Sequence, residues 1–161
     1  MALSSGQLAT LKAAIIADAT LNAQPNNSDG AFAIAAAMNL SASPAFTVWK
    51  TSVSIRDVGD KINGTELAGL SNLNTTRLQM VVMLSDSGIN AVLNDRRQFF
   101  DDIFSGAGGT NTRANLLTLW KRLATRAEKL FATGTGSDAS PATMTFEGTL
   151  SYQDVQTARN S

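Results

Sequence analysis

The longest helical pattern in the chain runs from Asn111 to Thr133, where apolar residues recur every three or four positions. This spacing puts them on one side of a helix, over a width that suits contact with a core rather than a narrow coiled-coil seam. Asn111 or Thr110 can cap the start, and Gly134 can adopt the left-handed conformation that ends a helix. The pattern therefore predicts one long amphipathic helix at the centre of the fold. Its apolar face comprises Leu116, Leu117, Trp120, Leu123, Ala124, Ala127, Leu130 and Phe131.

The opposite face of this predicted helix is basic. Arg122, Arg126 and Lys129 follow one another at spacings of four and three residues, and Lys121 borders the apolar face on its other edge. Neighbouring like charges at these spacings destabilise an isolated helix by about 0.2–0.5 kcal/mol per pair. Two interpretations are open: a solvated surface, or a contact with an acidic partner, either protein or nucleic acid. We call Lys121, Arg122, Arg126 and Lys129 the basic quartet, and they are the candidate binding residues of the chain.

Shorter helical patterns occupy the rest of the chain. Ser4 or Ser5 can cap a first helix that extends to about Ala19. A turn containing Pro25 follows, and an alanine-rich helix is then predicted over residues 31–40. Further helices are predicted over residues 55–62, 65–70, 75–85, 89–104 and 152–159.

The connections between these helices predict how the helices are arranged. The short connector over residues 105–110 favours an antiparallel hairpin between the helix over 89–104 and the long helix. Residues 46–53 form either a short strand or an extended segment that anchors Trp49 in the core. Residues 133–145 are rich in Gly, Ser and Thr, so we expect 133–150 to be an extended interaction loop or arm. The predicted fold is mainly α: a single-domain helical bundle over residues 1–161 with a C-terminal arm.

The composition excludes several kinds of chemistry. The chain has no Cys and no His, which excludes disulfides, thiolate nucleophiles, Ser-His-Asp triads and imidazole-ligated zinc. Charged residues make up 16% of the chain, against about 25% in a typical soluble domain. A surface so poor in charge suits a protein that packs against copies of itself or against partners, although a secreted protein can look similar.

Carboxylates alone could still carry out acid–base catalysis, but their spacing does not favour it. Asp101 and Asp102 are adjacent on a predicted helix and point about 100° apart, which makes them a poor catalytic pair. Asp57 and Asp60 share a face with flanking basic residues, as on a solvated helix. Glu147, in an apolar context, fits capping or pairing with Arg122 or Arg126 better than catalysis. We therefore predict that the chain is not an enzyme.

The glycine-rich segments do not form a nucleotide-binding motif. Residues 105–110 and 134–140 lack both the Gly-Lys-Ser/Thr of a P-loop and the GxGxxG spacing of dinucleotide-binding proteins. We expect no cofactor and no metal. The N-terminal segment lacks a basic region, and Lys12 and Asp18 interrupt its apolar run, so we expect neither a signal peptide nor a membrane contact.

The charge balance does not favour specific recognition of DNA. The net charge of the chain is zero. Seven basic and four acidic residues lie between Asp95 and Lys129, and seven minus four leaves this stretch at +3. A sequence-specific DNA-binding protein normally has a stronger basic patch and a recognisable helical motif. Non-specific contact with phosphates needs less charge per chain where several copies line one channel.

Several segments resemble a family of small proteins of tailed bacteriophages. The most similar part is Arg122–Asp154, which contains KRLATRAEKLFATGTGS and SPATMTFEGTLSYQDV. The segments QLATLKAAI, NNSDGAFAIAAAMNL and FTVWKTSV are similar to the same family in the same order, so the resemblance covers nearly the whole chain. Members belong with virion morphogenesis proteins. The resemblance therefore implies a structural role in the head or neck of the virion, and it assigns no catalytic residues.

Size, helical content, low charge and absent catalytic chemistry favour a head–tail adaptor within this class. Such a subunit forms a ring, here of roughly twelve copies, between the portal protein and the tail or neck proteins. The basic quartet would then face another subunit or the packaged DNA in the lumen. The alternatives are a tail terminator, a capsid-decoration protein, a tail-tube protein or a nucleic-acid-binding packaging accessory. Tail-tube and terminator proteins are usually rich in strands, which this sequence is not.

Overall fold

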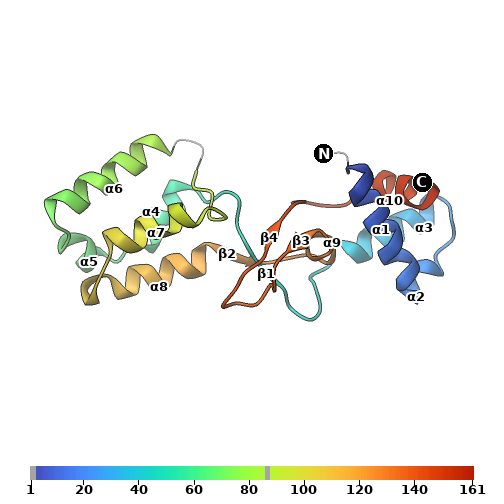
Figure 1. The fold of residues 1–161 in the computed structure, drawn as a ribbon, viewed down its shortest axis with the longest axis horizontal. Coiled ribbons are helices and arrows are strands. Elements are labelled where there is room, and N and C mark those ends of the chain that lie inside the picture. Colours follow the sequence, from blue (N-terminus) through green and yellow to red (C-terminus); the bar gives the residue numbers. More distant parts are fainter. Residues whose placement is uncertain (1–2, 86–87) are drawn as a thin grey trace. The chain divides into compact units, whose positions relative to one another are not determined.

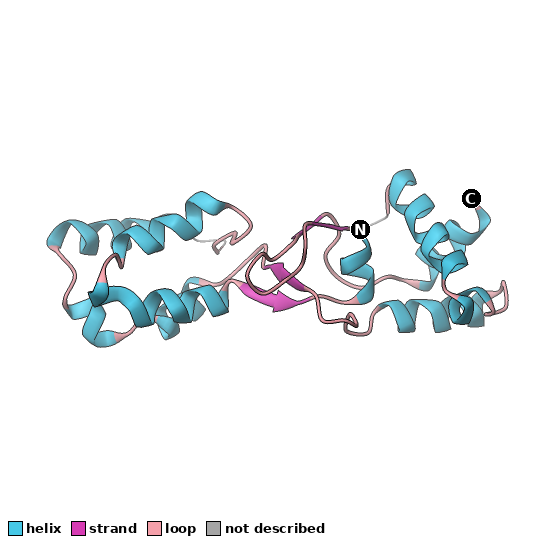
Figure 2. Cartoon of the chain, turned by 60° about the horizontal axis from the view of Figure 1, so that its bottom comes forward, coloured by secondary structure: helices cyan, strands magenta, loops and turns pink. Residues whose placement is uncertain are grey.

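The computed structural model describes residues 3–85 and 88–161 of the chain. Most of these residues are helical, and the strands form two small two-stranded sheets (Figures 1 and 2). The prediction of a mainly α fold is therefore confirmed. None of the helices formed by these residues is both long enough and apolar enough to span a membrane.

The chain divides into two compact units. The first unit comprises residues 1–48 and 123–161, and the second unit comprises residues 49–122. The second unit is therefore inserted, in sequence, between the two parts of the first. The single-domain organisation over residues 1–161 stays a prediction, and each unit is described here by itself.

The first unit is built from helices and a short hairpin. Helix α3 contacts the C-terminal helix α10, and α10 also contacts α1. The buried core of this unit includes Leu11, Ile34, Phe131 and Val155. Its elements are α1 (Ser5–Ala17), α2 (Ala19–Asn22), α3 (Ser28–Met38), α9 (Arg126–Leu130), β3 (Ala132–Thr133), β4 (Thr143–Met144) and α10 (Tyr152–Asn160).

Side-chain caps fix the ends of the helices in the first unit. Ser4 caps α1 and Ser151 caps α10, each in a reciprocal capping box. The side chain of Asn39 donates to the carbonyl of Leu150 (2.9 Å) and accepts from its N–H (2.8 Å). These two bonds tie the end of α3 to the segment that leads into α10.

The second unit is a smaller group of helices. Helix α4 contacts α8, and α6 contacts α7. Its core includes Phe100, Phe104, Leu116 and Trp120, each at most 2% exposed. Its elements are α4 (Ile55–Lys61), α5 (Gly64–Ala68), α6 (Asn72–Leu84), α7 (Asn94–Ile103), the 3-10 helix η1 (Ala107–Gly109) and α8 (Thr110–Leu119).

The predicted helical hairpin is present in the second unit. Helices α7 and α8 lie side by side and are joined through η1 (Figure 1). The rings of Phe100 and Trp120 lie 5.5 Å apart between them. The guanidinium group of Arg113, near the start of α8, donates to the carbonyl of Phe104 at the end of α7. The two helices therefore run in opposite directions.

The prediction of one long helix over residues 111–133 is wrong. Helix α8 ends at Leu119, strand β2 (Lys121–Leu123) follows, and α9 begins at Arg126. Strand β2 pairs with β1 (Thr47–Trp49), so this backbone uses partners outside the helix. The carbonyl of Trp120 accepts from the N–H of Lys50 (2.8 Å), and the N–H of Ala124 donates to the carbonyl of Phe46 (2.9 Å). These long-range bonds override a helical pattern that the local sequence supports.

The segment expected as an extended arm folds back into a hairpin. Strands β3 and β4 pair antiparallel, with Ala132 opposite Met144 and Thr133 opposite Thr143. Ala142, Met144 and Phe146 are buried, so much of this segment contributes to the core of the first unit. A role of residues 133–150 in interactions with partners stays a prediction.

Candidate functional site

The structure distributes the basic quartet over two elements. Lys121 and Arg122 lie half-buried on strand β2, whereas Arg126 and Lys129 lie on helix α9. The sequence pattern had placed three of these residues on one face of a continuous helix. Because the backbone is extended between α8 and α9, the basic quartet does not form a single helical face. The prediction of a basic face on one continuous helix is therefore wrong.

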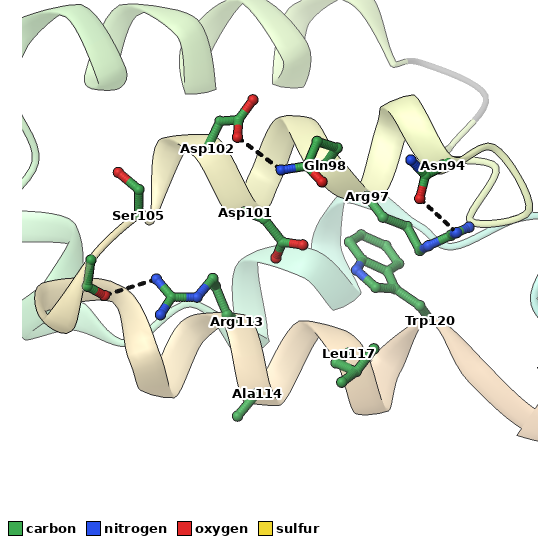
Figure 3. Close-up of a pocket in the computed structure, with 11 residues that line it drawn as sticks. Asn94, Arg97, Gln98, Asp101, Asp102, Ser105, Arg113, Ala114, Leu117 and Trp120 are labelled. Carbon is green, nitrogen blue, oxygen red and sulfur yellow. Dashed lines mark hydrogen bonds between the residues drawn. The ribbon is translucent and has the colours of Figure 1, made fainter. Parts of the chain in front are cut away.

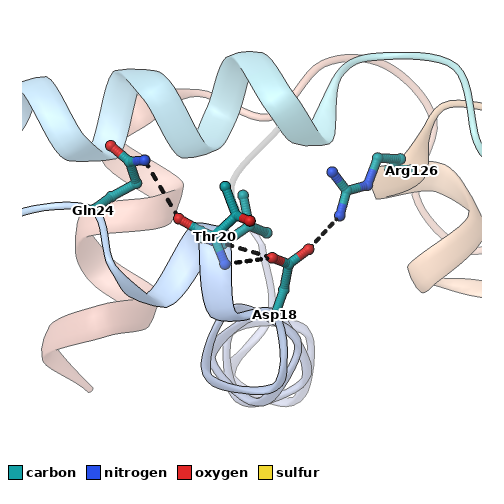
Figure 4. A network of polar contacts seen from close by, with 5 residues as sticks. Asp18, Thr20, Gln24 and Arg126 are labelled. Carbon is teal, nitrogen blue, oxygen red and sulfur yellow. Dashed lines mark hydrogen bonds and ion pairs between the residues drawn. The ribbon is translucent and has the colours of Figure 1, made fainter.

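Arg126 forms an ion pair that stabilises the first unit. One guanidinium nitrogen lies 2.8 Å from Oδ2 of Asp18 (Figure 4). The other carboxylate oxygen of Asp18 caps α2 by accepting from the N–H groups of Thr20 (2.9 Å) and Leu21 (3.1 Å). The bond from Leu21 and then the bond from Arg126 hold the pKa of Asp18 below its ordinary value. Arg126 is therefore already paired with an acid of its own chain.

Lys129 lies beside an apolar pocket in the first unit. Its ammonium nitrogen is 5.5 Å from the centre of the Phe46 ring. The pocket, which we call the α9 pocket, has a volume of about 410 Å³. Because Arg126 is already paired with Asp18, the apolar floor with Lys129 at its rim suits an apolar group that carries one negative charge. The pocket is lined by Ala14, Leu21, Met38, Ser43, Arg126, Lys129 and Leu130.

A second pocket lies between helices α7 and α8 of the second unit, and we call it the α7–α8 pocket (Figure 3). Its volume is about 540 Å³. Helix α8 contributes the apolar part, through Ala114, Leu117 and Trp120, and α7 contributes polar side chains. The polar lining includes Asn94, Arg97, Gln98, Asp101 and Asp102 from α7, with Ser105 and Arg113 at one end.

The two arginines of this pocket are engaged with backbone carbonyls. Arg97 donates to the carbonyls of Ala91 and Val92 (3.0 Å for the latter), and its guanidinium lies 3.9 Å from the centre of the Trp49 ring. Burial lowers the pKa of Arg97. Arg113 donates to the carbonyls of Phe104 and Gly106 (2.9 Å for Gly106). Both cations thus fix the ends of the hairpin.

Asp101 and Asp102, the acids of the α7–α8 pocket, have fewer hydrogen-bond partners than its two arginines. The carboxylate of Asp102 accepts a hydrogen bond from Nε2 of Gln98 (2.9 Å). Burial raises the pKa of Asp101, the charge of Arg113 opposes that shift, and the neighbouring Asp102 adds to it. The pocket therefore combines an apolar floor with two carboxylates that an incoming cation would stabilise.

Glu66 has a structural role that its sequence context does not reveal. Its carboxylate accepts from the N–H of Asn111 (2.9 Å), the side-chain amide of Asn111 (3.0 Å) and the N–H of Thr112 (2.7 Å). These bonds, those from Thr112 first, hold the pKa of Glu66 below its ordinary value although burial opposes the shift. Glu66 from α5 therefore caps α8, a role that the sequence assigned to Asn111 or Thr110.

Glu128 is a second acid with a structural position. It is 2% exposed, and its carboxylate accepts from the N–H groups of Thr125 (2.9 Å) and Gly148 (3.2 Å). The first bond belongs to a capping box that starts α9. The Thr-x-x-Glu spacing of Thr125 and Glu128 was a signal for a helix start, and the longer helical pattern around it masked that signal.

Helix α6 differs from expectation in which of its residues are buried. The apolar residues of the helix predicted over residues 75–85 indicate a core contact through Leu78, Val81, Val82 and Leu84. Leu78 is buried and Val81 is half-buried, but Val82 and Leu84 are 48% and 80% exposed. Apolar residues lie around most of the circumference of this helix, so the pattern does not define which side faces α7.

No relative in sequence or structure assigns a function to the basic quartet or to either pocket. Among residues 3–85 and 88–161, no group of three or more acidic, His or Cys side chains is placed to hold a metal ion. In the comparisons with known proteins, no family model, no curated protein and no solved structure matches the chain.

Proposed function

We propose that this protein is a structural subunit of a tailed-bacteriophage virion, and specifically a head–tail adaptor. The observation that carries the proposal is the exposed apolar surface of helix α6. Leu73, Met80, Met83 and Leu84 are between 55% and 82% exposed. Single exposed apolar residues are ordinary, whereas a group on one helix marks an interaction surface. A subunit of a larger assembly buries such a surface against its neighbours.

The low charge of the chain and its resemblance to phage virion morphogenesis proteins support the same proposal. Because charged residues make up 16% of the sequence, only a small part of the surface is charged. The α9 pocket and the α7–α8 pocket add two recesses with apolar floors and charged rims, which suit side chains of neighbouring subunits.

The proposed assembly is a ring of roughly twelve copies in the virion neck, below the portal protein and above tail or neck proteins. Non-specific contact with packaged DNA would involve the rest of the basic quartet, because Arg126 is paired with Asp18. Lys129, which lies at the rim of the α9 pocket, is then more suited to an acidic group of a neighbouring subunit than to the lumen.

The experiment that tests the proposal is to locate the protein in intact particles by cryo-electron microscopy and to count its copies. A single ring beneath the portal is the expected result. Hundreds of copies over the shell or along the tail would assign decoration or tube formation instead. Absence of the protein from purified particles, shown in parallel by mass spectrometry, would overturn the structural role.

A further inference from the structure

Helix α6 carries an apolar stripe that its own unit leaves uncovered. Leu73, Met80, Met83 and Leu84 occur at relative positions 0, 7, 10 and 11, which lie on one side of a helix. Their exposed fractions are 61%, 55%, 82% and 80%. Leu78, which is buried, lies on the other side. We call these four residues the α6 stripe.

Within helix α6 itself, one charge lies beside the α6 stripe. Arg77 lies between Leu73 and Met80 on the same side of the helix, is exposed, and is the only charged residue in the sequence of α6. A surface that complements the stripe must therefore be apolar and carry a negative charge at its edge. A second α6 helix supplies apolar residues but no acid.

The α7–α8 pocket has these two properties. Leu117, 48% exposed, and Ala114 form apolar lining from α8, while Asp101 and Asp102 supply negative charge from α7 (Figure 3). Arg97 and Arg113 act on Asp101 through their charges, whereas the carboxylate of Asp102 accepts a hydrogen bond from the neutral side chain of Gln98 and stays available to an incoming cation. The raised pKa of Asp101 shows that burial disfavours its ionised form, and a cation nearby would offset that effect.

We propose that the α6 stripe of one copy of the chain docks in the α7–α8 pocket of a second copy, with Arg77 opposite Asp101 and Asp102. The stripe and the pocket are different surfaces of one unit, so the contact is heterologous: the first copy keeps a free pocket and the second copy keeps a free stripe. Such contacts build rings when the rotation closes. The inference deepens the proposed function by naming the subunit contact, and it rests on that function only for the closure of the ring.

The exposed area predicts a small contact of the weak, transient class. The four residues of the stripe offer roughly 550 Å², against about 800 Å² per partner in a standard protein interface. A contact of this size, with one ion pair at its edge, is expected to have a Kd of about 1–100 µM for a single pair of copies. Association should therefore be visible with purified protein well below about 0.5 mM.

Sedimentation velocity with matched variants tests the contact. Met83→Glu alters the stripe, Leu117→Glu alters the pocket, and Ile16→Glu is the control, since Ile16 is 58% exposed on α1 of the first unit. The wild type and the control should associate with rising concentration, and the stripe and pocket variants should stay monomeric. An equimolar mixture of these two variants should form dimers and nothing larger, because each contributes one intact surface. Circular dichroism identical to the wild type shows that each variant is folded, and Leu117→Ser replaces Leu117→Glu if it is not.

A charge exchange tests the orientation. Arg77→Glu should raise the Kd about tenfold, and adding Asp102→Lys in the same chain should restore most of the affinity. A wild type that stays monomeric at about 0.5 mM overturns the inference. So does a pocket variant that associates as the wild type does, which would mean that α6 pairs with itself. If the purified protein self-associates as described but is absent from the virion, the virion role is refuted and this contact is not. If the protein forms a neck ring through other surfaces, this contact is refuted and the virion role is not.

Discussion

Replacing Leu116 by Ala, with Leu117→Ala as its control, tests the placement of helix α8 directly. Leu116 is 1% exposed within the core of the second unit, whereas the next residue, Leu117, is 48% exposed. Truncating a fully buried leucine costs about 3–5 kcal/mol, through lost transfer free energy and the cavity left behind. The same truncation at a half-exposed position is expected to cost less than about 1 kcal/mol.

Tryptophan fluorescence measures this difference in the right part of the chain. Both tryptophans of the protein, Trp49 and Trp120, lie in the second unit, so their emission reports the unfolding of that unit. For a chain of this size, about 2–4 °C of Tm corresponds to 1 kcal/mol. Leu116→Ala should therefore lower the fluorescence Tm by roughly 10 °C, and Leu117→Ala by less than about 4 °C.

The result that would refute this reasoning is an equal shift for the two variants. The sequence pattern placed both leucines on the core side of one long helix, and that arrangement predicts two similar losses. Far-UV circular dichroism recorded in the same samples adds a second measurement. Coincident transitions by the two probes would support the prediction of one domain, and an earlier fluorescence transition would show that the second unit unfolds by itself.

Two further predictions concern a buried acid and a glycine. The pKa of Glu66 is lowered in the folded state, so its contribution to stability is complete above the unfolded pKa of about 4.3 and is lost as the pH falls through the lower folded pKa. Glu66→Gln should destabilise the protein at pH 7 and flatten the acid side of its stability profile, measured by urea unfolding; an unchanged profile would contradict the capping role. A Cβ on Gly136, whose φ is +66°, would lie 2.1 Å from Cε2 of Phe46, so Gly136→Ala should lower the Tm far more than Gly106→Ala, where φ is +73° and no atom lies within 4 Å. Similar losses at the two glycines would show that backbone strain, and not the close contact with Phe46, sets the cost.

Local signals predicted much of the secondary structure. Ser4, one of two predicted caps, begins α1. Ser54 and Ser151 directly precede the helices predicted over residues 55–62 and 152–159 and cap them, because a hydroxyl followed by a free first-turn N–H needs no distant partner. The hairpin of α7 and α8 was predictable for a similar reason, since the connector is too short to allow many other arrangements.

The errors occur where distant residues decide the outcome. The break after Leu119 depends on bonds from Lys50 and to Phe46, which lie about seventy residues earlier in the chain. The cap of α8 comes from Glu66, forty-five residues before Asn111. The basic quartet was therefore placed on a helical face that does not exist, because its geometry followed from the long helix. The exposed side of α6 was missed because the helix has apolar residues around most of its circumference.

The interrupted path of the first unit has a consequence for synthesis on the ribosome. Residues 49–122 are complete before the last helix of the first unit, α10, has been made. The inserted unit can therefore fold before α10, which contacts α1 and α3 in the finished protein, has been synthesised. Once the inserted unit has folded, pairing of β1 with β2 brings the two halves of the first unit together, and far less chain entropy remains to be lost in joining them.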